Sequence, residues 1–483
     1  MLRLRKSAEN GFNIGSVTIC PVDKLLKSDK IQCYSAVKFR DLTLKTARPI
    51  LRIGDFVFRL SFHLIIISTA LLGMAGCEKS EPPVFRFNAV EWVKQEKTHL
   101  GEGEHFPEEY KTEIGTIMTA LFGTPDDPKF PFFLGDEDPA HDIISLENLK
   151  MAAGPTRVDK RELASGLYRE HCAHCHGITG NGAGDTAASL EPYPRDFRLG
   201  KFKFKSTPLR SPPTDHDLTE ILVNGIPGSA MPSFRTLPEG EIQSLVEYVK
   251  YLTMRGQFER FLLGELAALD GEPLIDLSLV NKPNGEEPSE DDIEEFEDQM
   301  YTVIGEGLQE RIIDRWLRPE RKVTKVEAAP PEFDLKHEGH SEFVQQGREL
   351  FFAKGNCMQC HGDTGIGDGQ LNNFDDWTND WIKSAEVDPD NPASYSDFSA
   401  VGALPPRPVK PRNLTRHYYR GGDHPDDLYL RLRNGIEGTP MPASTAMTSD
   451  EIWAVVAYVR AMPYQDSKKK RSVKPVNEKQ VMR

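Results

Sequence analysis

Apolar residues recur at helical spacing in two stretches of the chain, and the second stretch repeats the first 210 positions later. Their members are Ile242, Leu245, Val246, Val249 and Leu252 in the first, and Ile452, Val456 and Val459 in the second. Spacing of i, i+3, i+4 and i+7 places such residues on one face of a helix. Thr448, followed three residues later by Glu451, adds a capping box before the second stretch. The pattern therefore predicts a duplicated amphipathic helix.

Four further segments predict helices. Residues 107–122 carry apolar side chains at helical spacing, residues 161–168 form a short helical stretch, and residues 258–266 read as a separate amphipathic helix. An acidic helix is expected to begin near Ser289, because nine acids and no base lie within 286–298. Such a run is typical of a solvated helix face. The chain is therefore expected to be mainly α.

A continuous apolar run at 62–76 has a different character. It follows Arg59 and ends in Met74-Ala75-Gly76-Cys77, which is the layout of a secretory signal and is too short for a comfortable membrane span. The ending resembles a bacterial lipobox, which implies cleavage before Cys77 and acylation of that residue; a buried structural cysteine is the alternative. A start of translation at Val57 would give this signal an ordinary length.

Composition describes a soluble globular protein of two or three domains: 483 residues, with 38% apolar and 28% charged content. The charge divides at the end of the apolar run. Residues 1–76 hold 12 bases and 5 acids, whereas the remaining chain holds 47 bases and 69 acids, a net charge of −22. A chain with this balance is not expected to bind nucleic acid.

One five-residue pattern with distinctive chemistry occurs twice, as Cys172-Ala173-His174-Cys175-His176 and as Cys357-Met358-Gln359-Cys360-His361. At this spacing two thiols can bond the vinyl groups of a haem while the adjacent imidazole reaches the iron. Half a zinc site or a redox dithiol is the alternative. Zinc would need the four cysteines to converge across both copies, which would leave the repeated histidine unexplained.

A Met-Pro pair follows each copy, at Met231-Pro232 and Met441-Pro442. Neither methionine lies on a helical stripe of the kind that fills a core. Each follows an irregular segment rich in glycine, 224–230 and 434–440, in which the backbone can bring a thioether close to a metal. Both methionines are therefore candidate axial ligands.

These motifs resemble class I c-type cytochromes, from the helix before each Cys-x-x-Cys-His to the helix after each Met-Pro. The resemblance implies two covalently bound haem c groups, attached through Cys172 and Cys175 and through Cys357 and Cys360. It also implies iron ligands His176 and Met231 in one domain, and His361 and Met441 in the other. The expected fold is mainly α, with two tandem cytochrome c domains joined by an acidic, partly helical linker. The expected parts are a signal at 1–76, an extension at 77–156, domains at 157–256 and 340–465, a linker at 257–339, and a basic tail at 466–483.

The two copies differ by 25 extra residues in the second, which we assign to 375–403. This insertion is expected to shield the haem or to contact a partner, and shielding is favoured. Each copy also places bases between its haem motif and its methionine, which would steer an acidic partner or neutralise haem propionates. They are Arg195, Arg198, Lys201, Lys203 and Lys205, and Lys410, Arg412, Arg416 and Arg420.

Closed His/Met ligation favours electron transfer over catalysis, because an enzyme needs an open position on the iron. We therefore expect a carrier that passes electrons between redox partner proteins of a respiratory chain. Its expected location is the periplasmic side of a bacterial membrane, with a lipid anchor at Cys77. The alternatives are a dihaem redox enzyme of the peroxidase or sulfur-compound dehydrogenase type, or the cytochrome subunit of a larger membrane oxidoreductase.

Overall fold

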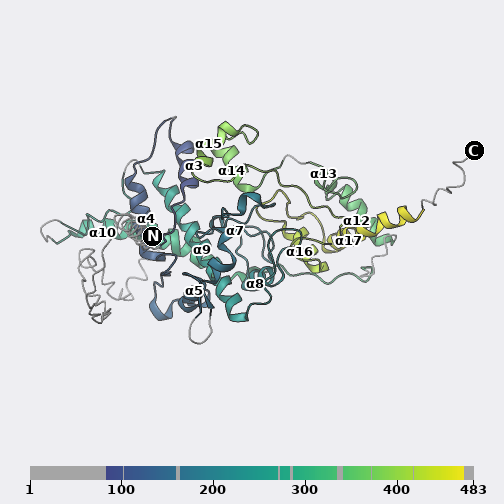
Figure 1. Ribbon diagram of the computed structural model, residues 1–483, viewed down its shortest axis with the longest axis horizontal. Coiled ribbons are helices and arrows are strands. Elements are labelled where there is room, and N and C mark those ends of the chain that lie inside the picture. The colour runs from purple at the N-terminus through teal and green to yellow at the C-terminus, as the bar shows by residue number, and fades with distance from the viewer. Residues whose placement is uncertain are drawn as a thin grey trace, which may run out of the picture. The chain divides into compact units, whose positions relative to one another are not determined.

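The computed structural model describes residues 83–472, except for 102, 159–163, 270–271, 283–286, 334–340, 371–372 and 417. The expected signal and Cys77 lie outside this part. The described chain is mainly helical (Figure 1), and its one sheet is the antiparallel pair of β1 (Arg157–Val158) and β2 (Ala164–Ser165). Short 3-10 helices lie at η2 (Gly135–Glu137), η3 (Pro139–Asp142), η4 (Ala187–Ser189), η5 (Phe197–Leu199) and η8 (Pro319–Lys322).

The long helix α9 (Glu239–Leu266) is the centre of the first half of the described chain. Three helices of the N-terminal extension pack on it (Figure 1): α3 (Ala89–His99), α4 (Glu109–Phe122) and α5 (Leu146–Ala152). The apolar periodicity at 107–122 was therefore a correct indication of a helix. The extension forms one hydrophobic core with α9, so it is part of the first globular unit rather than a free spacer.

Buried polar groups fix this packing. Glu247 on α9 accepts hydrogen bonds from the backbone N–H of Ser145 at 2.6 Å and from Nδ2 of Asn148 at 2.7 Å. Glu259, nearer the C-terminal end of α9, accepts a hydrogen bond from the backbone N–H of Asn88 at 3.0 Å and pairs with Arg255. Buried polar groups are costly unless they are satisfied, so these bonds specify where the extension docks.

Two helix predictions were wrong in detail. Residues 258–266 are not a separate helix but the last turns of α9, because Phe258 and Leu262 continue its buried face. The helix expected at 161–168 does not pass through Gly166, which has a φ of +76°. A Cβ atom there would lie 2.6 Å from the carbonyl carbon of Pro155, so α6 starts only at Leu167 (Leu167–His171).

Corresponding helices build two repeats, which we call the first repeat (167–266) and the second repeat (342–472). The first contains α6, α7 (Ala173–His176), α8 (Asp215–Asn224) and α9, and the second contains α12 (Glu342–Phe352), α13 (Met358–His361), α16 (Pro425–Asn434) and α17 (Ser449–Ser472).

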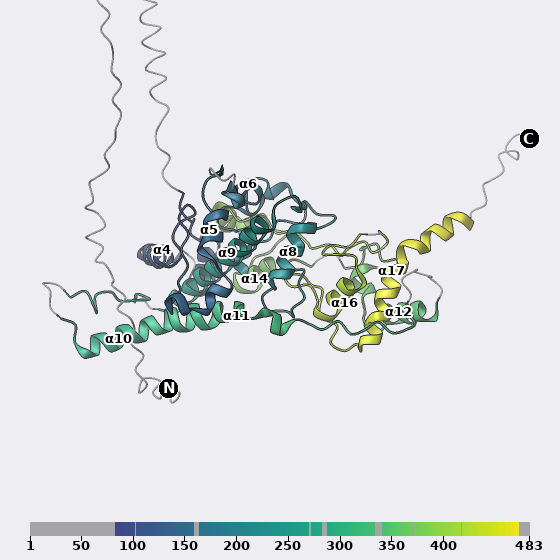
Figure 2. The ribbon, with the colours of Figure 1, turned by 90° about the horizontal axis from the view of Figure 1, so that it is seen from below.

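In the second repeat, α12 packs along α17 (Figure 2). The two backbones come close at Gly347, where a Cβ atom would lie 1.9 Å from the carbonyl oxygen of Ala454. The predicted capping box is also present: the backbone N–H of Thr448 donates to Glu451 at 2.8 Å, and the backbone N–H of Glu451 donates to the Thr448 hydroxyl at 3.3 Å. The close contact at Gly347 thus packs α12 against α17, and the capping box fixes where α17 begins.

Between the repeats the chain forms one long helical stretch. It consists of α10 (Glu290–Met300), a segment with π-type hydrogen bonds (Tyr301–Ile313) and α11 (Asp314–Trp316). Ser289 caps its start, as expected, by accepting from the backbone N–H of Asp292. The acidic α10 buries none of its residues, whereas the following segment packs against α9 (Figure 2). The acidic run is therefore a solvated helix face.

The insertion of the second repeat contains α14 (Asp376–Ser384), η9 (Pro392–Tyr395) and α15 (Ser396–Ala400), and it lies against α3 (Figure 1). Trp381 stacks on Phe398 at 4.3 Å between ring centroids, and Val90 and Val93 of α3 pack against this pair. Ion pairs join Lys94 to Asp380 at 2.7 Å and Lys97 to Asp397 at 2.6 Å. We call residues 375–403 the clasp, because they hold the second repeat to the N-terminal extension.

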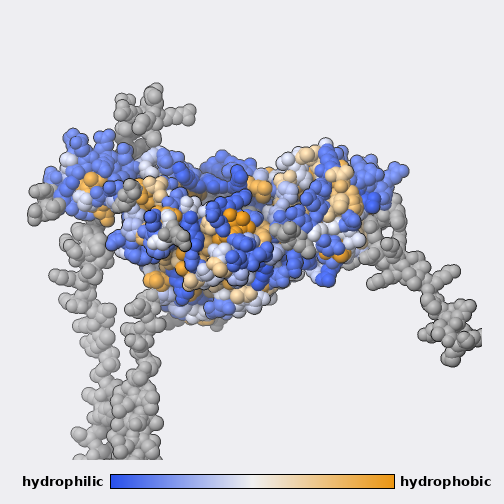
Figure 3. Space-filling view, turned by 90° about the horizontal axis from the view of Figure 1, so that it is seen from above, coloured by the Kyte–Doolittle hydropathy of each residue, from blue (hydrophilic) through white to orange (hydrophobic). Residues whose placement is uncertain are grey.

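On the face seen in Figure 3, hydrophilic side chains predominate and hydrophobic ones lie in separate patches between them. Within the described residues, no helix is both long enough and apolar enough to cross a membrane.

Candidate functional site

Each Cys-x-x-Cys-His motif forms a single helical turn, α7 in the first repeat and α13 in the second. The backbone N–H of His176 donates to the carbonyl of Cys172 at 2.8 Å, and that of His361 donates to Cys357 at 2.9 Å. Residues four apart lie on one face of such a turn. The turn therefore presents the first cysteine and the histidine of each motif to the same side.

Both histidines are fixed by a backbone carbonyl. Nδ1 of His176 lies 3.0 Å from the carbonyl oxygen of Arg195, and Nδ1 of His361 lies 3.0 Å from that of Arg412. A carbonyl can only accept, so Nδ1 carries the proton and Nε2 keeps its lone pair. Burial lowers the pKa of both imidazoles, which favours this neutral form. Each ring is thus prepared to ligate a metal through Nε2.

The two methionine loops have the same hydrogen bonds. The backbone N–H of Met231 donates to the Ser229 hydroxyl at 3.2 Å, and that of Met441 donates to the Thr439 hydroxyl at 3.2 Å. Each loop closes with a 3.1 Å bond from Ile226 or Ile436 to the carbonyl of its methionine. Ser229 and Thr439 are equivalent in the two loops, because both residue types supply the hydroxyl that accepts this bond. Both loops therefore hold the methionine in the same way.

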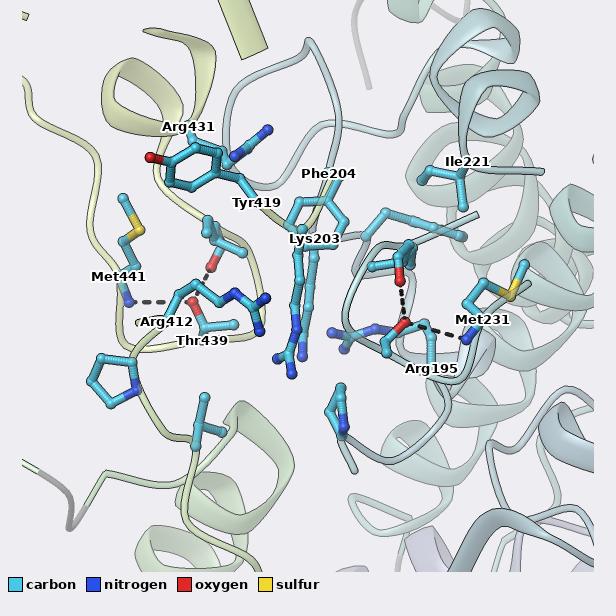
Figure 4. A pocket seen from close by; sticks show the side chains of 18 of the residues that line it. Arg195, Lys203, Phe204, Ile221, Met231, Arg412, Tyr419, Arg431, Thr439 and Met441 are labelled. Carbon is cyan, nitrogen blue, oxygen red and sulfur yellow. Dashed lines mark hydrogen bonds between the residues drawn. The ribbon is translucent and has the colours of Figure 1, made fainter. Parts of the chain in front are cut away.

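One continuous cavity of about 830 Å³ extends through both repeats. Met231 and Met441 lie on its two sides (Figure 4), with Arg195 and Arg412 between them. All eight residues that the sequence singled out line it: Cys172, Cys175, His176 and Met231 from the first repeat, and Cys357, Cys360, His361 and Met441 from the second. The structure thus brings together every predicted site residue.

The lining fits a haem in each repeat. The closing helices supply apolar walls, with Val246 and Val249 from α9 and Val455, Val456 and Val459 from α17. Among the described residues that line the cavity there is no Asp or Glu, whereas six are Lys or Arg. Nε of Arg412 is buried and makes no hydrogen bond within the described chain. Apolar walls suit a porphyrin, and an unsatisfied buried donor suits a propionate.

The four thiols do not form a zinc site. No three His, Cys, Asp or Glu side chains converge as metal ligands anywhere in the described ranges. Burial raises the pKa of Cys172 to about 12 and that of Cys357 to about 11, so both groups are protonated thiols in the metal-free protein. Their placement favours covalent capture by a cofactor over metal ligation.

Several bases expected to steer an outside partner are instead internal. Lys205 is 4% exposed and pairs with Glu437, in the Met441 loop, at 2.5 Å between Nζ and Oε2. Arg198 is buried and pairs with Asp196 at 2.8 Å. The steering interpretation was wrong for Lys205 and Arg198, because carboxylates of the chain itself pair with their charges. For Arg420, which is half-buried and donates to the carbonyl of Gly228 at 3.1 Å, steering stays a prediction.

None of the clasp's described residues lines the cavity. Trp377 packs behind a residue that does, since its ring lies 6.4 Å from that of Tyr193. Trp381 fastens the clasp to α3, and shielding of the haem by the clasp stays a prediction. The sequence reasoning also missed the role of the Arg195 and Arg412 carbonyls. The repeated Pro-Arg pair after each glycine-rich loop, at 194–195 and 411–412, was the available signal.

Comparisons with known proteins match both repeats. Residues 161–249 match the family described as cytochrome c oxidase, cbb3-type, subunit III, and residues 344–417 match the cytochrome c family. No curated protein sequence matches the chain. Among solved structures, it is similar to a chain of the reducing HAO-like protein complex of Kuenenia stuttgartiensis, with 23% identity, a TM-score of 0.39, and coverage of 62% of this chain and 94% of that chain. The family matches identify both repeats as cytochrome c domains, and the protein is accordingly a dihaem c-type cytochrome with two covalently bound haem c groups.

Proposed function

We propose that the protein passes electrons between redox partner proteins of a respiratory chain, with each haem held by one repeat. In this proposal Cys172 and Cys175 attach the first haem, with His176 and Met231 as iron ligands. Cys357 and Cys360 attach the second, with His361 and Met441. The observation that carries the proposal is that all eight residues line one cavity, with two cysteines, one histidine and one methionine from each repeat. When bound, haem supplies a one-electron iron couple.

The chain's own residues then have defined tasks. The carbonyls of Arg195 and Arg412 hold the imidazoles in the tautomer that leaves Nε2 available. The hydroxyls of Ser229 and Thr439 fix the methionine loops. The helices α9 and α17 exclude water from the apolar walls. A site in which the chain would supply both iron ligands, the histidine and the methionine, would suit electron transfer, because nothing needs to enter.

An enzymatic role is the second candidate, of the peroxidase or sulfur-compound dehydrogenase type. A role as the cytochrome subunit of a larger membrane oxidoreductase is the third, and the match of residues 161–249 to an oxidase subunit family supports it. That name describes relatives of the first repeat. Carbon monoxide separates carrier from enzyme: a reduced protein that stays Met-ligated will not bind it, whereas an open haem will.

The test starts from intact mass and haem staining of the mature protein, which should show two covalent haems. Cys172→Ala with Cys175→Ala should leave one. Met231→Ala and Met441→Ala should each open one iron to carbon monoxide, while the wild type binds none without denaturation. Binding of carbon monoxide by the native reduced wild type would favour the enzyme.

We also propose a periplasmic location with a lipid anchor at Cys77. The apolar run at 62–76 and the lipobox-like ending support it. Mature protein should partition with membranes, and Cys77→Ser should abolish acylation. An N-terminal peptide that begins upstream of Cys77 in mature protein would contradict the anchor.

A further inference from the structure

Arg195 and Arg412 occupy equivalent positions in the two repeats. Each follows a proline and each offers its carbonyl to the histidine of its own repeat, at 3.0 Å in both cases. Two residues after each arginine, the backbone closes the same turn. The backbone N–H of Phe197 donates to the carbonyl of Gly180 at 2.8 Å, and that of Leu414 donates to the carbonyl of Gly365 at 2.7 Å. The backbone of each arginine therefore belongs to the haem site of its own repeat.

The two side chains extend the other way, toward the opposite repeat (Figure 4). A Cβ atom built on Gly438, three residues before Met441, would lie 3.0 Å from Nη1 of Arg195. A Cβ atom built on Gly228, three residues before Met231, would lie 2.7 Å from Nη2 of Arg412. Each guanidinium thus contacts the methionine loop of the other repeat, and the exchange is reciprocal.

Positive charge is concentrated where the two arginines meet. Lys203 lies between them (Figure 4), and Arg420 and Arg431 also line the cavity. Burial, and then the charge of Arg412, lower the pKa of Arg420. Like charges held together in a partly buried region need counter-charge. Asp375 supplies part of it, since the charges of Arg195 and Lys203 act on its carboxyl group, and haem propionates from both repeats would supply more.

We propose that the guanidinium of each arginine tunes the haem of the opposite repeat, so that Arg412 raises the reduction potential of the first haem and Arg195 raises that of the second. The inference rests on the dihaem function proposed above. A nearby positive charge favours the reduced iron, which carries one positive charge less than the oxidised iron. Because the backbone and the side chain of one residue act on different haems, the two sites are coupled. Arg195 and Arg412 are positioning residues rather than ligands.

The test measures the potential of each haem separately in the holoprotein. Stepwise reduction followed by NMR resolves the haem methyl signals of the two sites. Phe197→Leu assigns them, because Phe197 stacks on His176 at 4.6 Å and its loss should shift the signals of the first haem alone. Arg412→Gln and Arg195→Gln then remove one charge each without removing the backbone carbonyl.

The expected pattern is crossed. Arg412→Gln should weaken reduction of the first haem by up to about tenfold, which is about 59 mV for one electron, with a smaller change at the second. Arg195→Gln should do the reverse. The matched Lys substitutions should restore most of each loss, and Arg416→Gln, an exposed arginine on the same segment as Arg412, should change neither potential.

A protein with two covalent haems in which each Gln variant changes only the haem of its own repeat, or neither haem, overturns the crossed tuning and leaves the dihaem function standing. A wild-type protein with fewer than two covalent haems overturns the dihaem function itself. Haem content and the NMR titration therefore separate the two failures.

Discussion

At the scale of single residues, the buried carboxyl group of Asp375 makes the stability of this protein depend on pH. It caps α14 by accepting from the backbone N–H of Thr378 at 3.1 Å. Burial raises its pKa to about 6, although the hydrogen bond to Thr378 and the charges of Arg195 and Lys203 act in the opposite direction. A carboxyl group with a raised pKa holds a proton in the folded state that the unfolded state releases at about pH 4.

Asp375→Asn should therefore change the pH dependence of stability. From about pH 4 to about pH 6 the folded state binds more protons than the unfolded state, so the free energy of unfolding of the wild type falls as pH rises through this window. The variant keeps the cap acceptor and lacks the charge. It should gain roughly 1–2 kcal/mol over the wild type at pH 7, less than the full shift because the side chain is partly exposed, and nothing at pH 4. Urea unfolding at both pH values measures this. A gain that is equal at pH 4 and pH 7 would show that ionisation of Asp375 is not the cause.

The pair of Lys205 and Glu437 is a second residue-scale feature with a measurable effect. Lys205→Met should destabilise the protein by about 3–5 kcal/mol, because it leaves a buried carboxylate without its partner. Adding Glu437→Gln should recover much of this loss, since the amide remains an acceptor for the backbone N–H of Arg210. Denaturant unfolding of both single variants and the double variant gives the coupling. Additive losses would mean that the pair is not an energetic unit.

At the scale of elements, the clasp is fastened by a stacked apolar pair rather than by its ion pairs. Trp381 is 5% exposed, whereas the carboxylate of Asp397 that pairs with Lys97 is 60% exposed. Surface ion pairs contribute little, and a buried aromatic side chain contributes several kcal/mol. The contrast between these two contacts gives a direct test.

Trp381→Ala should increase hydrogen exchange throughout α3, α14 and α15 while leaving both haem potentials unchanged. The reason is that the cavity it leaves lies within the clasp and not beside a haem. Asp397→Asn, at an exposed pair in the same interface, is the control and should change stability by less than about 1 kcal/mol. Altered haem potentials in Trp381→Ala would show that the clasp acts on the cavity after all.

How much the sequence predicts depends on how far apart the interacting residues lie. Signals contained in a few residues were reliable: the helix start near Ser289, the capping box at Thr448 and the haem motifs are local. Gly166 was misread because its constraint comes from the backbone of Pro155, 11 positions earlier. Lys205 was misread because its partner, Glu437, lies in the other repeat. No local pattern contains such pairs, which become visible only once both repeats have folded.

For the whole molecule, charge is divided between inside and outside. The chain from residue 77 carries a net charge of −22, and bases such as Lys205 and Arg412 are directed inward, to the region between the repeats. An outside partner therefore meets a surface with an excess of acids. The solvated helix α10 contributes to this excess. We predict that such a surface attracts a cationic partner, an alternative to the acidic partner that the bases near the haem motifs favoured.

Salt should therefore act in opposite directions on small redox reagents of opposite charge. Reduction or oxidation by a cationic ruthenium complex should slow as ionic strength rises, and reaction with an anionic iron cyanide complex should accelerate. Stopped-flow rates from about 10 mM to 500 mM salt, where the screening length falls from about 30 Å to a few Å, measure both. Rates that fall with salt for the anionic reagent would place a basic surface at the site of electron entry.

The clasp also has a consequence for the order of events during folding. Lys94 and Asp380 are 286 positions apart, so their contact closes a loop that includes the whole first repeat. Closing so long a loop costs entropy that only the finished second repeat can offset. During synthesis the N-terminal part of the chain emerges first. The contacts within the first repeat therefore form before the clasp, which is the partner segment of α3, has been made. The clasp is accordingly expected to close late in folding, after the contacts within each repeat have formed.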